Sequence, residues 1–332
     1  MRHSLLERAH MLEWERVVED IRTGRIHSST EVVFYAMDKM LEALTLEKRL
    51  DRFAELALRI VRARPTSALL ANSIRELAKT VLEYSGESPE SVHEKASSKV
   101  AEIKERIKAT VEEASSIAEK RLEDGDTVLT ASYSVFVKKT IEKAIKGGKE
   151  IRVIVTESRP GSEGVRLAAE LADIGCDVTL IVDSAVRYVM KNVDKVLLSS
   201  ESVTANGANV NKVGSSQIAL AAHEARVRVF VVTSTLKFSP ETLVGGLVEI
   251  PEADTTEIKN YLAQRGIEGV KVRAPLFDVT PPEYIDAIIT EKGLVAPSFV
   301  IMTVRDLYGW PPKPTPLENL LTALSKVGTY GG

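Results

Sequence analysis

Polar side chains that could bind or transform an anionic ligand follow three short apolar runs of the sequence. The first group is Thr130–Ser134, within VLTASYSVFV. The second, in TESRPGSEG, contains Arg159, and the third, in SSESVTANGANVNKVGSSQ, contains Glu201 and the pair Asn211–Lys212. Hydroxyl groups, cations and helix starts are the donors that bind phosphate, while a carboxylate can accept or donate a proton. These residues predict a pocket for a phosphorylated small molecule.

Each of these residues also has a purely structural explanation. Ser134 and Ser215 could be helix N-caps and nothing more. Arg159 could pair with a surface carboxylate, and Glu201 at a strand end could be solvated or ion-paired. Lys212 alone would be a solvated charge. The case for a binding site therefore rests on whether the fold brings these groups to one edge.

Short β-branched runs alternate with helical patterns from residue 123 onward. The runs are TVLTA, EIRVIVT, DVTLIV, DKVLLS and RVRVFVVT, and the helical patterns include VFVKKTIEKAIKGG, EGVRLAAELADIG and SSQIALAAHEARV. This alternation predicts a doubly wound, mostly parallel sheet, in which ligands bind beyond the carboxyl ends of the strands. Gly147–Gly148 and Gly175 fall where helices should end. The three polar groups would then share one edge of the sheet.

The first 122 residues have the spacing of successive helices. Met11, Trp14 and Ile21 lie on one face of the first helix, Ser29 or Thr30 would cap the second, and Pro65 stops the third. We predict a helical N-terminal domain over 1–122 and a Rossmann-like α/β domain over 123–332 that holds the ligand pocket. Beyond Pro240 the sequence predicts a helix over 257–265, an extended piece over 270–280, a helix opening at Pro281–Pro282, and an extended or docked tail after Trp310.

Composition narrows the classes of function. Of the 332 residues 27% are charged, with a net charge of −3, so there is no direct signal for nucleic acid. Cys176 is the only cysteine, which excludes a disulfide framework, and its apolar surroundings predict a buried, inert thiol. The histidines at 3, 10, 27, 93 and 223 lack metal-ligand spacing. No apolar stretch approaches the roughly 18–20 residues of a membrane span, so we expect a cytoplasmic protein without membrane, metal or other cofactor.

Three separated motifs resemble the translation initiation factor 2B alpha/beta/delta subunit family. They are ESRPGSEGVRLAAEL, NGANVNKVGSSQIALAAHEA and FDVTPPEYIDAIITEKGLVAPSFV, in the order in which the family has them. The resemblance extends from about residue 20 to residue 310. The family includes isomerases of methylthioribose 1-phosphate and of ribose 1,5-bisphosphate. The resemblance implies a helical N-terminal domain and a Rossmann-like domain through which members form homodimers, and in some cases hexamers.

The resemblance also implies which branch of the family the chain is most similar to. In the isomerases the first strand end reads Thr-His-Cys-Asn-Ser and a Gly-Ala-Asp follows the fourth strand, with the Cys and Asp as the catalytic pair. Here TASYS places Ser132 at the Cys position and SSE places Glu201 at the Asp position. A serine hydroxyl lacks the pKa of about 8.5 that lets a thiol exchange protons near neutrality. Tyr133, Ser134 and Glu201 instead match the Ala-Tyr-Ser and Gly-Ala-Glu of the regulatory alpha subunits.

The phosphate-binding motifs of the family are retained better than the catalytic pair. RARPTSALL resembles an Arg-Pro-Thr motif, which implies that Arg64 and the helix start after it hold a phosphate, and IRTGRIHSS matches the isomerases' Ile-Arg-Gly-Ala in part. The residues that the resemblance assigns to ligand binding are Arg22, Arg64, Thr66, Ser67, Ser134, Arg159, Asn211 and Lys212.

We therefore expect a regulatory, alpha-subunit-like protein that binds a sugar phosphate or nucleotide without turnover. It would be a homodimer or hexamer and would interact with translation initiation factor 2. The alternative is an aldose–ketose isomerase of a ribose phosphate, with ring opening, hydrogen transfer between the first two carbons, and Glu201 as acid or base. A structural oligomer with an empty pocket is a third hypothesis.

Overall fold

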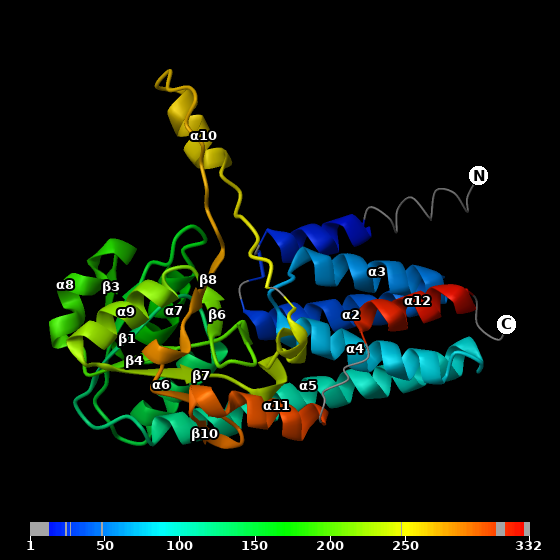
Figure 1. Cartoon of the computed structure of the whole chain (residues 1–332), viewed down its shortest axis with the longest axis horizontal. Helices are drawn as coiled ribbons and strands as arrows, with labels where there is room; N and C mark the ends of the chain where they lie inside the picture. The colour runs from blue at the N-terminus through cyan, green and yellow to red at the C-terminus, as the bar shows by residue number, and fades with distance from the viewer. Residues whose placement is uncertain are drawn as a thin grey trace.

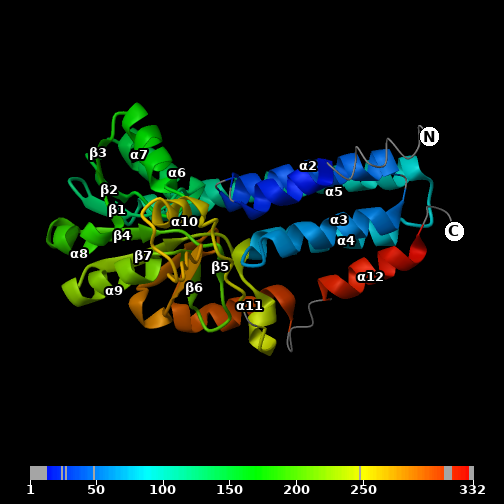
Figure 2. The ribbon, with the colours of Figure 1, turned by 90° about the horizontal axis from the view of Figure 1, so that it is seen from above.

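The computed structural model describes residues 13–23, 25–26, 28–47, 49–246, 248–309 and 316–328. A bundle of helices lies beside a sheet that carries helices on both faces (Figures 1 and 2). This arrangement confirms the predicted fold class, a helical N-terminal part followed by a mostly parallel, Rossmann-like sheet. Met11 and Trp310, on which two of the predictions depended, lie outside the described residues.

The helical bundle is built from long amphipathic helices that bury their apolar faces against one another. Ser28 begins the first with a capping box: its hydroxyl accepts a hydrogen bond from the Glu31 N–H (3.1 Å), and its own N–H donates to the Glu31 carboxylate (3.2 Å). The cap is therefore Ser28 rather than Ser29 or Thr30. Residues 13–22 are helical, and the helices that follow are α2 (Ser29–Glu47), α3 (Leu50–Ala63), α4 (Ala68–Glu83) and α5 (Pro89–Glu119).

The main sheet has the strand order β10-β9-β7-β4-β1-β2-β3. All neighbours are parallel except β9 and β10. Because β1 pairs with β2 on one side and with β4 on the other, the direction of winding reverses between β1 and β4. The strands are β1 (Thr127–Thr130), β2 (Arg152–Thr156), β3 (Asp177–Ile181), β4 (Lys195–Leu198), β7 (Arg228–Val232), β9 (Ala287–Thr290) and β10 (Gly293–Val295).

Two apolar cores cover the two faces of this sheet. One contains the end of α5 together with α6 (Val135–Lys146) and α7 (Glu163–Asp173). The other contains α8 (Val186–Val189), α9 (Ser215–Ala225) and α11 (Val300–Tyr308). Gly147 caps α6, and Gly175, with φ +82°, follows α7, as predicted. The sheet is therefore doubly wound.

A second, antiparallel sheet lies at the edge of the main sheet where the polar groups were predicted to meet. It consists of β5 (Ser202–Val203), β6 (Asn209–Lys212) and β8 (Phe277–Thr280). Helix α10 (Thr256–Ala263), close to the predicted 257–265, lies on an arm that projects away from the body (Figure 1). Single 3₁₀ turns are Asp183–Ala185, Met190–Asn192, Thr235–Lys237, Pro240–Val244, Pro282–Tyr284 and Pro297–Phe299.

Near the C-terminus one predicted element is wrong, and of the two alternatives predicted for the tail, extended or docked, the structure shows the docked one. The predicted helix at Pro281–Pro282 is one 3₁₀ turn, and the apolar residues after it form the buried strand β9. The tail contains a helix, α12 (Leu317–Val327), which returns to the bundle and packs against α3 and α4. The boundary at 122 stays a prediction, since α5 gives Ile107 to the bundle core and Val111 to the sheet core. None of the helices in the described ranges is long and apolar enough to cross a membrane.

Candidate functional site

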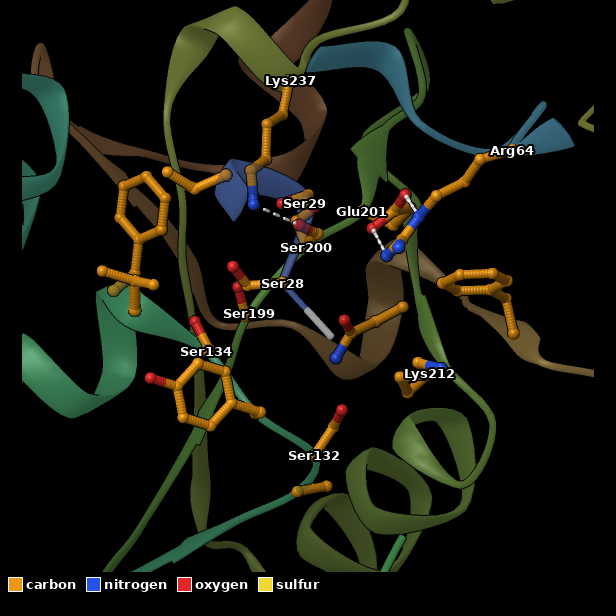
Figure 3. Close-up of a pocket in the computed structure, with 17 residues that line it drawn as sticks. Ser28, Ser29, Arg64, Ser132, Ser134, Ser199, Ser200, Glu201, Lys212 and Lys237 are labelled. Atoms are coloured by element: carbon orange, nitrogen blue, oxygen red, sulfur yellow. Dashed lines mark hydrogen bonds and ion pairs between the residues drawn. The ribbon is translucent and has the colours of Figure 1, made fainter. Parts of the chain in front are cut away.

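A polar pocket lies beyond the carboxyl ends of the central strands, where the bundle meets the sheet (Figure 3). The cavity left between its lining side chains has a volume of about 20 Å³. Because β1 and β4 flank the point where the winding reverses, this is the position at which doubly wound folds bind ligands. The pocket is lined by Ser132 and Ser134 after β1, Ser199, Ser200 and Glu201 after β4, Lys237 after β7, Asn211 and Lys212 on β6, and Ser28, Ser29, Thr30 and Arg64 from the bundle.

Glu201 and Arg64 form a buried, two-pronged ion pair across the pocket (Figure 3). Arg64 Nε donates to Glu201 Oε1 at 2.7 Å, and Nη2 donates to Oε2 at 3.0 Å. Burial alone would raise the pKa of Glu201, but the positive charges of Arg64 and Lys237 hold that pKa below its ordinary value. The carboxylate is therefore ionised, and the guanidinium predicted to hold a phosphate points at Glu201.

Lys212 and Asn211 face the pocket from β6, as the sequence predicted. Lys212 forms an ion pair with Glu163, which is buried in the first turn of α7. Its Nζ also lies 5.2 Å from the centre of the Phe277 ring. Asn211 Nδ2 donates to Ser215 Oγ at 3.0 Å. Both side chains are thus held in place by polar partners, Glu163 and Ser215, that do not line the pocket.

Lys237 is a pocket residue that the sequence analysis missed. The side chain is 2% exposed, and its Nζ donates to the Ser200 carbonyl oxygen at 2.7 Å. Burial lowers the pKa of Lys237 to about 8, with Glu201 opposing the change and Arg64 adding to it. The signal was present in the sequence: RVRVFVVT is a fifth strand whose end, like the other three, carries polar residues.

The loop after β1 is held in an unusual backbone conformation. Ser132 has φ +61°, in the left-handed region that residues with a Cβ rarely adopt. Its N–H donates to Ser158 Oγ at 2.6 Å, and the N–H of Ser158 in turn donates to the Asp183 carboxylate at 2.8 Å. Ser134 caps α6, with its hydroxyl accepting from the Val137 N–H at 3.4 Å. Ser134 is therefore both an N-cap and a pocket residue.

Tyr133 ties this loop to the bundle. Its hydroxyl donates to Glu170 at 2.9 Å, and the Arg166 guanidinium lies 4.0 Å from the centre of its ring. Arg166 also donates to Glu31 on α2 at 3.1 Å. Since α2 starts beside the pocket, this network holds the serines of its first turn against the loop after β1.

Four predicted binding residues lie outside the pocket. The Arg159 side chain is exposed and pairs with Glu257 of the arm at 3.6 Å, because Asp183 accepts the Arg159 N–H and turns the loop outward. Arg22 is exposed and donates to Glu19 at 2.9 Å. Thr66 and Ser67 line a neighbouring cavity that does not include Glu201. Ser67 nonetheless reaches Glu201, since a hydrogen bond from its side chain helps to lower the pKa of that carboxyl. Ligand binding by these four residues stays a prediction.

The start of α9 is also not free for a ligand. Asp278 accepts hydrogen bonds from the Gly214 N–H at 2.7 Å and the Ser216 N–H at 3.1 Å. Burial raises the pKa of Asp278 to about 6, although these two hydrogen bonds act to lower it. The helix start predicted to bind an anion is therefore occupied by a carboxylate of the chain itself.

Neither a cluster of metal ligands nor a reactive thiol occurs in the part of the chain that the structure describes. No group of three His, Cys, Asp or Glu side chains is placed to hold a metal ion there. Cys176 is half-buried rather than buried, and its thiol donates to the Ile151 carbonyl oxygen at 3.4 Å. Burial raises the pKa of this thiol to about 11, so the thiol remains protonated near neutral pH.

Comparison with known proteins gives a consistent family assignment. Residues 30–297 match the initiation factor 2 subunit family. A ribose 1,5-bisphosphate isomerase of Archaeoglobus fulgidus is 39% identical over 303 residues, covering 90% of this chain and 95% of that protein. Six curated relatives at 35–41% identity, this one among them, bear this name.

Proteins named for translation initiation are similar at lower identity. An eIF-2B subunit 2-like protein of Pyrococcus abyssi is 31% identical and covers 85% of this chain and 95% of its own length. Among solved structures, the Pyrococcus horikoshii translation initiation factor eIF-2B superimposes with a TM-score of 0.74 at 29% identity, over 87% of this chain and 98% of that one.

Proposed function

The chain belongs to the initiation factor 2 subunit family, and within it we propose that the protein is an aldose–ketose isomerase of ribose 1,5-bisphosphate. The observation that carries this proposal is the name shared by six curated relatives at 35–41% identity. The pocket supports it, because an ionised carboxylate, a buried amine, two further cations and several hydroxyl groups surround one space. A sugar with two phosphate groups needs such a set of donors.

The prediction of a regulatory, alpha-subunit-like protein is wrong, since the relatives at higher identity over most of the chain bear the isomerase name. That prediction gave two short motifs, at Ser132 and Glu201, more weight than similarity over the whole length of the chain. It also overlooked Lys237, a pocket amine whose pKa burial lowers to about 8. The predicted interaction with translation initiation factor 2 was an implication of the regulatory hypothesis and falls with it.

Glu201 is the group that we assign to proton transfer at the sugar. Isomerisation breaks the bond between C1 and the ring oxygen and moves a hydrogen from C2 to C1. It also moves the proton of the 2-hydroxyl to the ring oxygen. An ionised carboxylate can accept the hydroxyl proton, and the Arg64 fork fixes the direction of the Glu201 oxygens. Glu201 is therefore the proton acceptor of this proposal.

The hydroxyl groups and cations around Glu201 would bind the phosphate groups. Lys212 and Asn211 approach the pocket from β6, and Ser132 and Ser134 approach it from the loop after β1. The strained backbone of Ser132 aims its hydroxyl at the ligand space, where it serves as a hydrogen-bond donor and not as a replacement thiol. Arg64 adds a guanidinium that can bond with a phosphate as well as with Glu201.

We also propose that the protein is a cytoplasmic homo-oligomer, a dimer or a hexamer. The exposed side chains of Leu180 on the edge strand β3 and of Val182 just after it support a partner at this edge. Light scattering should give a multiple of the 36.4 kDa chain mass. A monomer at micromolar concentration would contradict this part of the proposal.

The experiment is incubation of the purified chain with ribose 1,5-bisphosphate and, separately, with 5-methylthioribose 1-phosphate, followed by ³¹P and ¹³C NMR. We expect the bisphosphate to give a ketose carbonyl signal, because the pocket offers cations for a second phosphate. Binding of the bisphosphate without any turnover would overturn the proposed activity. Preference for the methylthio sugar would overturn the assignment of ribose 1,5-bisphosphate as the substrate.

A further inference from the structure

Lys237 differs from the other cations of the pocket in having no carboxylate partner. Among the described residues that line the pocket, Arg64 is paired with Glu201 and Lys212 with Glu163. Lys237 donates only to a carbonyl oxygen, that of Ser200, and its Nζ lies 4.9 Å from the centre of the Phe136 ring. Burying an amine outside any ion pair is unfavourable, which marks Lys237, after a central strand, as a candidate for function.

The backbone that carries Lys237 is fixed on both sides. The residue ends the 3₁₀ turn Thr235–Lys237, in which the Ser234 hydroxyl accepts from the Leu236 N–H at 3.1 Å. The Thr235 N–H and hydroxyl both donate to Glu291, in the turn between β9 and β10. The amine therefore reaches the pocket from a rigid support, as a group that acts on a substrate requires.

We propose that Lys237 is the proton donor of the isomerisation, in the role that the family resemblance gives to a cysteine at position 132. The ammonium gives its proton to the ring oxygen as the C1–O bond breaks. Glu201 accepts the proton of the 2-hydroxyl while the hydrogen on C2 moves to C1 with its electron pair. Protonated Glu201 then returns a proton to the amine, which restores both groups. This role rests on the proposed function.

The electrostatic surroundings suit this task. The charged groups that face Lys237 are Glu201, which raises its pKa, and Arg64, which lowers it, and burial outweighs both. With a pKa of about 8 the group is mostly protonated at neutral pH and still able to release its proton. An arginine at this position would keep the charge but could not lose the proton.

The test is a comparison of Lys237→Arg, Lys237→Met and wild type for turnover of ribose 1,5-bisphosphate across a pH series. The exposed Lys146→Arg is the matched control. We expect wild-type kcat to fall as pH rises through about 8, where the donor loses its proton. Lys237→Arg should keep a KM near the wild-type value, lose about 10²–10⁴-fold in kcat, and show no fall near that pH. Lys146→Arg should match the wild type.

Two outcomes would overturn the inference while leaving the proposed function intact. One is an active Lys237→Arg with the wild-type pH profile, and the other is a variant whose KM rises while kcat is unchanged, which indicates phosphate binding alone. A wild-type protein that turns over no sugar phosphate would instead overturn the proposed function itself. Circular dichroism melting of each variant identifies a loss of folding, and ¹³C NMR of labelled lysine measures the Lys237 titration directly in the wild type.

Discussion

At the scale of single residues, Arg64 and Glu201 form a buried ion pair within the site. Both side chains are buried, so removing one leaves the other as an uncompensated charge. We expect Arg64→Ala to lower the free energy of unfolding by about 3–5 kcal/mol. The double variant Arg64→Ala/Glu201→Gln should regain part of that loss in urea denaturation. A double variant that is less stable than Arg64→Ala would contradict the buried pair.

Lys237 predicts a specific dependence of stability on pH. Its pKa is about 8 in the folded chain and 10.5 as the ordinary value, so the unfolded chain binds more protons between these two pH values. The wild type should therefore gain stability relative to Lys237→Met as pH rises from about 8 to 10.5, with a constant difference below that window. Urea denaturation of both proteins at pH values inside and below the window measures this. The same pH dependence of the unfolding free energy in both proteins would contradict a buried amine at position 237.

The sequence predicted part of the pocket lining and missed Lys237. The rule that ligands bind beyond the carboxyl ends of the strands placed Ser132, Glu201 and Lys212 at one edge of the sheet, and the structure brings them together. The rule could not show that Arg159 turns away, because the hydrogen bonds from this loop to Asp183 form only in the folded chain. Lys237 was missed because only three of the strand ends were considered.

At the scale of elements, the contact between α7 and β2 depends on a residue without a side chain. A Cβ on Gly164 would lie 1.8 Å from the Thr156 carbonyl oxygen, so Gly164→Ala must push the start of α7 away from the strand. We expect a loss of about 1–3 kcal/mol in the free energy of unfolding, measured by urea denaturation. Gly86→Ala is the control, because its Cβ would meet nothing within 4 Å. Equal stability of the two variants would show that α7 packs differently.

The central elements were predictable because their patterns are local, whereas β9 was not. Five β-branched runs were read correctly as strands that became β1, β2, β3, β4 and β7. The segment before β9 begins with two prolines. Because proline also favours the start of a helix, a helix was predicted there. Only pairing with β7 decides that the apolar residues after the turn form a strand.

At the scale of the whole molecule, α12 closes the bundle from the far end of the chain. Leu324 is fully buried against the bundle core, whereas Leu307 on α11 is 43% exposed. We expect Leu324→Ala to cost about 2–5 kcal/mol of unfolding free energy, because it leaves a cavity. Leu307→Ala should change it by less than about 0.5 kcal/mol in the same denaturation experiment. Similar losses for both would contradict the docking of α12.

The long-range return of α12 could not be predicted from the prolines before it. Leu317, Leu320, Leu321 and Leu324 have helical spacing, but the sequence does not say which surface they cover. The two-part architecture was predictable, because a change from helical to alternating patterns is visible along the chain. How the two parts enclose a pocket depends on contacts such as that between Arg64 and Glu201, 137 residues apart.

Isomerisation of ribose 1,5-bisphosphate in the pocket around Glu201 is the proposal on which the others depend. The most direct measurement is the rate of ketose formation from this sugar by the wild type and by Glu201→Gln, followed by ¹³C NMR at saturating substrate. We expect turnover by the wild type and a loss of about 10²–10⁴-fold in kcat for the variant. No ketose from a folded wild type that binds the sugar, or equal rates from both proteins, would contradict it.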